Sequence, residues 1–216
     1  MFMFSDRTDA GERLAEAVAK AEPADPVVLA LPRGGVPVAL PVARALDAPL
    51  DLLLVRKIGM PGQLELAAGA LVEGDPPEAV YNAGILRLSG LSEDDFAGQV
   101  AEKTEEIAER RRLWLEDRAP VPLEGRTAVV VDDGIATGAT VRAALSGLRA
   151  RGPASVWLAV PVAPADTLRA LRPLADRVIC LSTPADFQAV GLHYRRFGQV
   201  SDAEVAELIR QDDSEE

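Results

Sequence analysis

The segment Val129-Val130-Val131-Asp132-Asp133-Gly134-Ile135-Ala136-Thr137-Gly138-Ala139-Thr140 joins an apolar run, two acids and a loop of small residues. The valines do not alternate with polar residues, so they predict a strand that is covered on both faces. The loop leads into a helix that we expect over residues 138–151, whose first amides would attract an anion. The order of strand, loop and helix is typical of α/β proteins, which bind ligands at the carboxyl ends of their strands.

The loop of this segment has the composition of a phosphate site. Gly134 and Gly138 allow tight turns and a close approach of the backbone to a ligand. Successive amides in such a loop form a nest for an anion, and Thr137 and Thr140 add hydroxyl donors. Gly-Lys-Ser/Thr and Gly-x-Gly-x-x-Gly motifs are both absent, which argues against a nucleotide P-loop and a dinucleotide site.

The two acids before the loop complete the chemistry. Asp132 and Asp133 would repel a phosphate, but they can accept hydrogen bonds from vicinal hydroxyls or hold Mg²⁺ through them. A phosphate at one end and a diol at the other describe a ribose 5-phosphate. The alternative is an acidic cap on an ordinary helix.

Other patterns along the chain extend the α/β prediction. Apolar runs predict further strands at 27–31, 51–55, 155–160 and 177–181. Helical patterns cover residues 9–21, 36–46, 164–174 and 201–210. This alternation predicts an open, mostly parallel, doubly wound sheet.

Residues 92–118 break the alternation and predict one long inserted helix that begins at Ser92. We expect its three consecutive arginines to form a solvated face that pairs with nearby glutamates. These arginines are Arg110, Arg111 and Arg112, and the glutamates are Glu105, Glu106 and Glu109.

Bulk properties narrow the class of protein. The 216 residues are enough for a single domain, 1–216, and 48% of them are hydrophobic. The formal net charge of −11 argues against a nucleic-acid partner. We find no signal peptide and no apolar run of the ~20 residues that span a membrane. Cys180 is the single cysteine and excludes an internal disulfide. We therefore expect a cytoplasmic protein.

Two further strand ends carry residues suited to anions. Arg33, Gly34 and Gly35 follow the first predicted strand and offer one guanidinium and bare amides. Arg56 and Lys57 follow the second, in a glycine- and proline-rich segment at 56–68 that we interpret as a flexible lid. Glu65, in the same segment, could orient a nucleophile or bind metal. Plain surface positions remain the alternative for all of these side chains.

The segment at 129–140 resembles the signature by which type I phosphoribosyltransferases bind 5-phosphoribosyl-1-pyrophosphate (PRPP). Leu-Pro-Arg-Gly-Gly at 31–35 and Val-Arg-Lys-Ile-Gly at 55–59 extend the resemblance to a bacterial group of such enzymes. It implies an α/β core at 9–181, a flexible loop at 56–68, the inserted helix at 92–118 and a hood at 182–200.

The resemblance also implies a role for each matching residue. Asp132 and Asp133 would bind the ribose hydroxyls, and reach Mg²⁺ only through ribose or water. The 5-phosphate would lie on Gly134, Ala136, Thr137, Gly138, Ala139 and Thr140. Pyrophosphate would meet Arg33, Gly34, Gly35, Arg56 and Lys57. The residues expected to take part in catalysis are Asp132, Asp133, Lys57 and Glu65.

The acceptor is less well indicated. Phe187, His193, Tyr194 and Phe197 are the rings available in the hood, and one of them could stack on a planar base. Relatives that salvage oxopurines usually carry Asp where this chain has Ala136, which counts against hypoxanthine and guanine and leaves adenine open.

We therefore expect a phosphoribosyltransferase that uses Mg²⁺ and PRPP, acts on a nucleobase-like acceptor and, by resemblance, forms a homodimer. Two alternatives remain from other classes: a non-catalytic regulator that binds PRPP, and a hydrolase that consumes PRPP without an acceptor.

Overall fold

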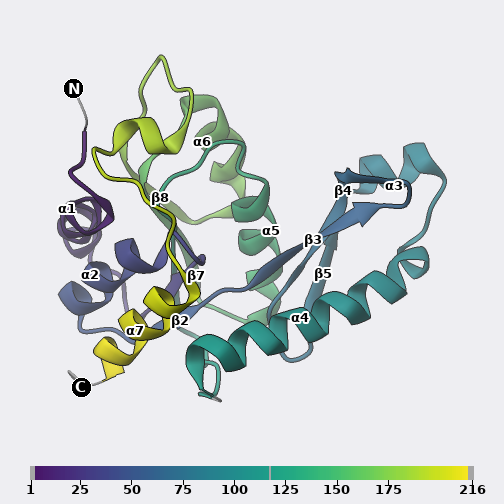
Figure 1. Cartoon of the computed structure of the whole chain (residues 1–216), viewed down its shortest axis with the longest axis horizontal. Coiled ribbons are helices and arrows are strands. Elements are labelled where there is room, and N and C mark those ends of the chain that lie inside the picture. Colours follow the sequence, from purple (N-terminus) through teal and green to yellow (C-terminus); the bar gives the residue numbers. More distant parts are fainter. Residues whose placement is uncertain (1–2, 117, 214–216) are drawn as a thin grey trace.

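A five-stranded parallel sheet forms the centre of the molecule (Figure 1). The computed structural model describes residues 3–116 and 118–213, and only the backbone of residues 63–65 and 213. Within it the strands lie in the order β2-β1-β6-β7-β8. Their bounds are Pro26–Ala30 for β1, Leu50–Leu52 for β2, Thr127–Val131 for β6, Ser155–Val162 for β7 and Arg177–Ser182 for β8. The expected open parallel sheet is confirmed.

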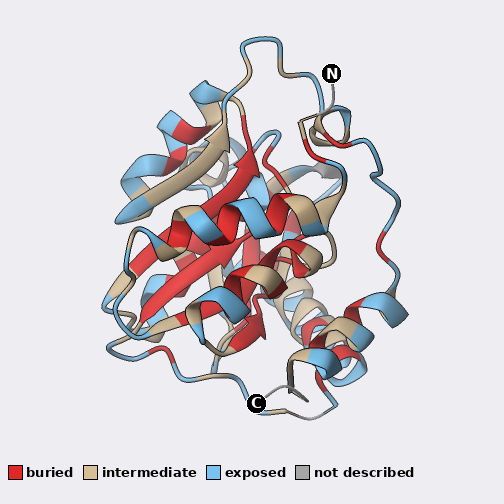
Figure 2. Ribbon diagram, turned by 90° about the vertical axis from the view of Figure 1, so that its left-hand side faces the viewer, coloured by how far each residue is buried: buried red, intermediate tan, exposed pale blue. Residues whose placement is uncertain are grey.

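Helices cover both faces of this sheet. The bounds are Arg7–Ala19 for α1, Val36–Leu46 for α2, Ala139–Leu148 for α5 and Ala165–Leu171 for α6. Val129 and Val131 of β6 pack in one cluster with α1 and α2, whereas Ala128 and Val130 pack in a second cluster with α5 and α6. Successive residues of a strand point to opposite faces, so a strand covered twice is apolar throughout. Figure 2 shows the buried strands between their helices.

An antiparallel arm extends from the parallel sheet (Figure 1). It contains β3 (Val55–Met60), β4 (Gln63–Val72) and β5 (Glu78–Tyr81), in that order across the sheet. The strand expected at 51–55 is therefore correct only in part, because β2 ends at Leu52 and Val55 already belongs to β3 of the arm. Residues 56–68, expected as a flexible loop, instead form most of the β3–β4 hairpin.

The sequence of the arm explains why its strands were missed. Residues 59–70 are rich in glycine and alanine, which have low intrinsic preference for strands. Pairing on both sides of β4 supplies the order that local propensity lacks. Helix α3 (Ala83–Ser89) follows at the far end of the arm, and α4 (Ala97–Leu115) returns along it to the body. The short helix η1 (Glu93–Phe96) precedes α4, and Ser92 and Asp95 form a capping box there.

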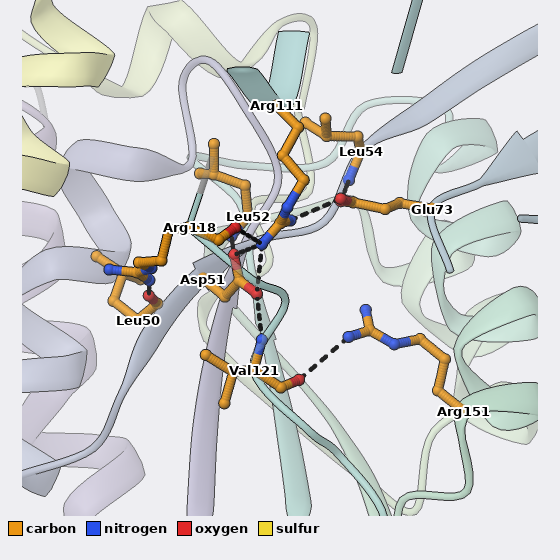
Figure 3. A network of polar contacts seen from close by, with 9 residues as sticks. All are labelled: Leu50, Asp51, Leu52, Leu54, Glu73, Arg111, Arg118, Val121 and Arg151. Atoms are coloured by element: carbon orange, nitrogen blue, oxygen red, sulfur yellow. Dashed lines mark hydrogen bonds and ion pairs between the residues drawn. The ribbon is translucent and has the colours of Figure 1, made fainter. Parts of the chain in front are cut away.

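The three arginines of α4 do not all lie on the solvated face expected from sequence: Arg112 is exposed, but Arg111 is not. Arg111 is instead paired with Asp51 at 3.1 Å and Glu73 at 2.6 Å, inside the protein (Figure 3). Asp51 lies in β2 and is fully buried, while Glu73 follows β4 and is 5% exposed. The prediction failed because both acids come from other elements, and Asp51 is hidden in an otherwise apolar run.

The remaining elements complete the C-terminal part. They are η2 (Arg149–Arg151), η3 (Arg172–Leu174), η4 (Val190–His193) and α7 (Asp202–Asp213). Residues 183–201 are mostly irregular and lie beside the N-terminal segment, where Phe4 forms an isolated bridge with Tyr194. None of the helices in residues 3–116 and 118–213 combines the length and the apolar character that crossing a membrane requires.

Candidate active site

Two loops meet at the carboxyl edge of the central sheet. Strands β1 and β6 are parallel neighbours, so the segments that follow them leave the sheet on the same side. The N–H of Leu31 donates to the carbonyl of Val131 at 2.9 Å, which joins the two strand ends. The residues that the sequence predicts for ribose, pyrophosphate and 5-phosphate therefore begin side by side.

The loop after β6 presents unoccupied amides at the start of α5. Gly138 is the N-cap of α5 and has φ +75°, a left-handed conformation that costs other residues about 1–2 kcal/mol. Among the described residues, no acceptor is found for the N–H groups of Ala136, Thr137, Gly138 and Ala139. Thr137 and Thr140 are exposed beside these amides. The arrangement suits a phosphate, because amides and the helix dipole both point at the same space.

Contacts with neighbouring elements hold this loop in place. The N–H of Ile135 donates to the carbonyl of Val162 at 2.9 Å, and the hydroxyl of Thr167 donates to the carbonyl of Ala136 at 3.0 Å. Gly134 is buried against Val190. These contacts attach the loop to β7, α6 and the C-terminal segment, so its amides are held in one orientation before any ligand arrives.

The loop after β1 packs directly against the second acid. A Cβ placed on Gly34 would lie 2.1 Å from Oδ2 of Asp133, closer than any real contact. The peptide bond between Pro32 and Arg33 is cis. Gly35 donates its N–H to the carbonyl of Leu31 at 3.0 Å. Glycine at position 34 therefore lets the Asp133 carboxylate reach the backbone of the predicted pyrophosphate loop.

The two acids share a partly buried position. Burial raises the pKa of Asp132 well above its usual range, and the charge of Asp133 raises it further. The N–H of Asp133, 2.8 Å from Oδ1 of Asp132, opposes that rise. Burial also raises the pKa of Asp133, against the opposing effect of Arg7. Adjacent carboxylates in such surroundings favour ligands that bring hydroxyl donors or positive charge.

Arg7 is a site residue that the sequence did not reveal. It begins α1, yet its Nε lies 2.8 Å from Oδ2 of Asp133. Its guanidinium lies over the ring of Phe197, 3.8 Å from the ring centroid. Arg7, Arg33, Gly34 and Asp133 line a cavity of about 410 Å³ together with residues 197–200. Nothing in the linear sequence joins positions 126 residues apart, so only the folded chain could place Arg7 here.

Arg33, predicted to contact pyrophosphate, lines this cavity. Its Nη1 is 3.6 Å from Oδ1 of Asp202, at the start of α7. Asp202 also pairs with Arg110 of α4 at 3.0 Å. The predicted pyrophosphate loop is thus connected to two helices by one carboxylate.

The two cations of the arm are separated by the pleat of β3. Arg56 pairs with Glu106 of α4 at 3.4 Å, whereas Lys57 lines a second cavity of about 760 Å³. Thr137 and Thr140 of the predicted phosphate loop line the same cavity. Successive strand residues face opposite sides, so only Lys57 can share a ligand with that loop. The side chain of Glu65 lies outside the described residues.

The hood residues take different positions. Tyr194 is 2% exposed and its hydroxyl donates to the carbonyl of Asp133 at 2.5 Å, so it supports the site from the core instead of offering a free face to a base. Burial raises the pKa of this phenol. Phe187 and His193 stack on each other with centroids 5.3 Å apart. Phe197 lines the smaller cavity beneath Arg7.

The acids fit a Mg²⁺ that is bound mainly by a ligand. Among the described residues, no group of three or more His, Cys, Asp or Glu side chains could form a metal cage. Mg²⁺ usually reaches proteins through one or two carboxylates together with substrate phosphates and water. Asp132 and Asp133 supply that number of carboxylates next to the predicted phosphate loop.

Comparison with known proteins agrees with this geometry. A family model described as "Phosphoribosyl transferase domain" matches residues 6–195. Two Mycobacterium tuberculosis proteins, each named "Putative phosphoribosyl transferase", are 47% identical to this chain over 211 residues. The matches cover 97% of this chain and 47% of each relative, so the chain spans about half the length of the curated relatives it matches.

Solved structures show the same likeness. The crystal structure of TT1426 from Thermus thermophilus is 42% identical, with a TM-score of 0.84 over 96% of this chain and 98% of that one. A hypoxanthine phosphoribosyltransferase from Staphylococcus aureus is 13% identical, with a TM-score of 0.50 over 91% of this chain and 84% of that one. The second comparison shows a shared fold alone. By the family model and the sequence identity together, this chain belongs to the phosphoribosyl transferase domain family.

Proposed function

We propose that this protein transfers the 5-phosphoribosyl group from PRPP to a nitrogenous, nucleobase-like acceptor and releases pyrophosphate. The observation that carries the proposal is the meeting of two loops at one sheet edge. Gly34 lies against the Asp133 carboxylate, and the open amides of residues 136–139 follow in the same loop. A diol site thus lies between a phosphate site and a second anion site, which is the order of groups in PRPP.

Each part of the donor has matching residues. The 5-phosphate would accept hydrogen bonds from the amides and hydroxyls at 136–140, and the ribose hydroxyls would donate to Asp132 and Asp133. The pyrophosphate would lie at Arg33, Gly34 and Gly35, with Lys57 approaching from the arm. These groups would neutralise charge and position the reacting atoms. Positioning and charge neutralisation are the main contributions that a protein makes to such a transfer.

Mg²⁺ fits this scheme as a partner of the donor. Bound to the pyrophosphate oxygens, it would supply positive charge as negative charge develops on the leaving group. Asp132 and Asp133 would hold it through ribose hydroxyls or water. Arg33 and Lys57 would add positive charge from the protein.

The position of the arm is consistent with its closing over the bound donor. Lys57 lies on β3 and shares its cavity with Thr137 and Thr140. A hairpin that carries a cation beside the phosphate loop can exclude water once the donor is bound. The expectations of a homodimer and of a cytoplasmic location remain predictions.

The acceptor would bind beside the smaller cavity. Phe197 lines this cavity and is 37% exposed, and its ring packs against Arg7 and Tyr194. Its exposed edge could contact a planar base there, as aromatic side chains do in sites that recognise bases. Ala136 offers no acidic contact to an oxopurine, so adenine or a less common base fits better than hypoxanthine or guanine.

The direct test is incubation with Mg²⁺ and PRPP against adenine, guanine, hypoxanthine, xanthine, uracil, orotate and nicotinate. Mass spectrometry would follow both nucleotide and remaining PRPP. We expect a nucleotide from one base. Loss of PRPP without a base would indicate the hydrolase instead. PRPP that stays intact with every base, and does not bind in calorimetry, would refute the proposal.

A variant locates the donor within the proposed site. Asp133→Asn removes a charge that we assign to the ribose hydroxyls, and we expect PRPP affinity to fall by roughly tenfold or more. Asp176→Asn is the matched control, because Asp176 accepts the N–H of Val156 at 2.7 Å at the other end of the sheet. Equal PRPP affinity in Asp133→Asn and the unmodified protein would contradict the assignment.

A further inference from the structure

The N-terminal helix contributes a cation to the predicted ribose site. Arg7 Nε lies 2.8 Å from Oδ2 of Asp133, and the two side chains are 13% and 14% exposed. A charged hydrogen bond with so little solvent around it is stronger and more directional than an exposed ion pair. Arg7 also compensates the negative charge of Asp133, which is one of two adjacent and partly buried carboxylates.

Two contacts fix the guanidinium before any ligand binds. Nη1 of Arg7 donates to the carbonyl of Gly198 at 2.7 Å. The guanidinium lies over the ring of Phe197 at 3.8 Å. The plane of a guanidinium is rigid, so a ring beneath it and a carbonyl at one end together set the direction of Nε. Phe197 and Gly198 lie beyond residues 6–195, the part of the chain that the family model covers.

Asp133 is held from two other sides as well. Gly34 lies so close that any Cβ there would clash with Oδ2. Tyr194 donates its hydroxyl to the Asp133 carbonyl. Within the described residues, Oδ1 of Asp133 accepts no hydrogen bond, although the residue lines the 410 Å³ cavity. One carboxylate oxygen is therefore used by the protein and the other is left for a ligand.

We propose that Arg7 is a positioning residue, which holds Oδ2 of Asp133 so that Oδ1 is kept for the ribose hydroxyls of PRPP. This inference rests on the proposed function. Arg7 acts through Asp133, so its removal should weaken recognition of the diol and leave recognition of the phosphate unchanged. A purely structural role would affect both alike.

The same helix offers a matched control. Arg13 donates to the carbonyl of Met3 at 2.8 Å and lies over the ring of Phe4 at 4.8 Å. It therefore makes the same kinds of contact with a carbonyl and an aromatic ring, but it pairs with neither site acid. Arg13→Gln should loosen the N-terminal segment about as much as Arg7→Gln, without affecting Asp133.

The experiment measures binding of ribose 5-phosphate and of its 2,3-dideoxy analogue by calorimetry with Mg²⁺, in the unmodified protein, Arg7→Gln, Arg7→Lys and Arg13→Gln. The ratio of the two affinities reports recognition of the diol. We expect this ratio to fall about tenfold in Arg7→Gln. It should recover in part in Arg7→Lys, which restores charge but not the planar fork. Arg13→Gln should keep the ratio of the unmodified protein.

The outcomes separate the two proposals. An unchanged ratio in Arg7→Gln, with ribose 5-phosphate still bound, would overturn the role of Arg7 and leave the proposed function intact. An equal fall of the ratio in Arg13→Gln would overturn it too, because the effect would then be structural. If the unmodified protein bound neither ribose 5-phosphate nor PRPP, the proposed function would fail and this inference with it. Affinity for the dideoxy analogue, which keeps the 5-phosphate and lacks the diol, should be about the same in all four proteins.

Discussion

The buried ion pairs of Arg111 predict a large loss of stability on replacement of that residue by methionine. Arg111 is the cation that contacts both the fully buried Asp51 and the nearly buried Glu73 (Figure 3). Methionine keeps an apolar stem like that of arginine but removes the guanidinium that pairs with the two buried carboxylates. Removing one partner of a buried pair typically costs ~3–5 kcal/mol.

The local contacts set where in that range the loss should fall. Asp51 keeps the N–H groups of Leu52 and Val121 as donors, at 2.8 and 2.9 Å, and Glu73 keeps that of Leu54 at 3.2 Å. Because these donors remain, we expect a loss of ~3–5 kcal/mol for the two acids together, and not a loss of that size for each acid. For a chain of this size, the melting temperature should fall by roughly 6–20 °C, at about 2–4 °C per kcal/mol.

The free energy of unfolding of Arg111→Met is measured by urea unfolding with circular dichroism as the signal, and Arg112→Met is the control. Arg112 is exposed on the next position of the same helix, so its replacement should change stability by less than ~0.5 kcal/mol. The variant Arg111→Met/Asp51→Asn/Glu73→Gln should regain most of the loss, because the side chains at positions 51 and 73 then carry no charge that needs a partner. Equal stability of Arg111→Met and Arg112→Met would refute the argument.

The pH dependence gives an independent check. Burial raises the pKa of Glu73, and the charge of Arg111 opposes that rise. Without Arg111 the pKa in the folded state rises further above its unfolded value. A group with a raised folded pKa contributes stability at low pH and loses it as the pH rises through that pKa. The penalty of Arg111→Met should therefore shrink at acid pH and grow toward neutral pH, and a constant penalty would exclude Glu73 as its source.

Three further predictions concern the site. Gly138→Ala should cost more than about 1–2 kcal/mol and weaken phosphate binding, because the new Cβ would also lie 2.8 Å from Cγ2 of Thr167. Gly125→Ala, at a similar φ of +74° with open space around it, should cost about 1–2 kcal/mol and leave binding unchanged in calorimetry. Tyr194→Phe should lower the free energy of urea unfolding by ~1–3 kcal/mol, since a buried carbonyl loses its donor; no change would mean that water replaces the hydroxyl. Lys57→Met should lower kcat/KM for PRPP in steady-state assays much more than Arg56→Met, because Arg56 faces α4; equal losses would show that both cations reach the ligand.

The order of strands and loops was predictable from the sequence because it depends on local patterns. Uninterrupted valines at 129–131 indicate a strand covered on both faces, and acids followed by a glycine-threonine loop indicate a ligand site at its end. The structure bears out the sheet, and places Asp132, Asp133, Arg33 and Gly34 at one edge of it. Helix α2 begins and ends where the periodicity predicts, at Val36 and Leu46.

The arm shows where local pattern was insufficient. Strand β4 is rich in glycine and alanine, and its order comes from pairing with β3 on one side and β5 on the other. Lys57 and Arg56 look equivalent in the sequence, yet the pleat of β3 sends them to different neighbours. Which cation meets the phosphate loop was decided by the register of a hairpin that the sequence only weakly specifies.

What the sequence by itself determined was the class of fold, the loops proposed to bind the donor and the chemical groups they carry, since each of these depends on residues within about a dozen positions of one another. What only the tertiary structure decided was which distant side chains meet, both in the candidate site and in the buried ion pairs. Arg7 reaches Asp133 across 126 positions, and Arg111 finds its partners 60 and 38 positions away. Charged partners this far apart in sequence leave no periodic pattern, because the packing of whole elements, and not local propensity, brings them together.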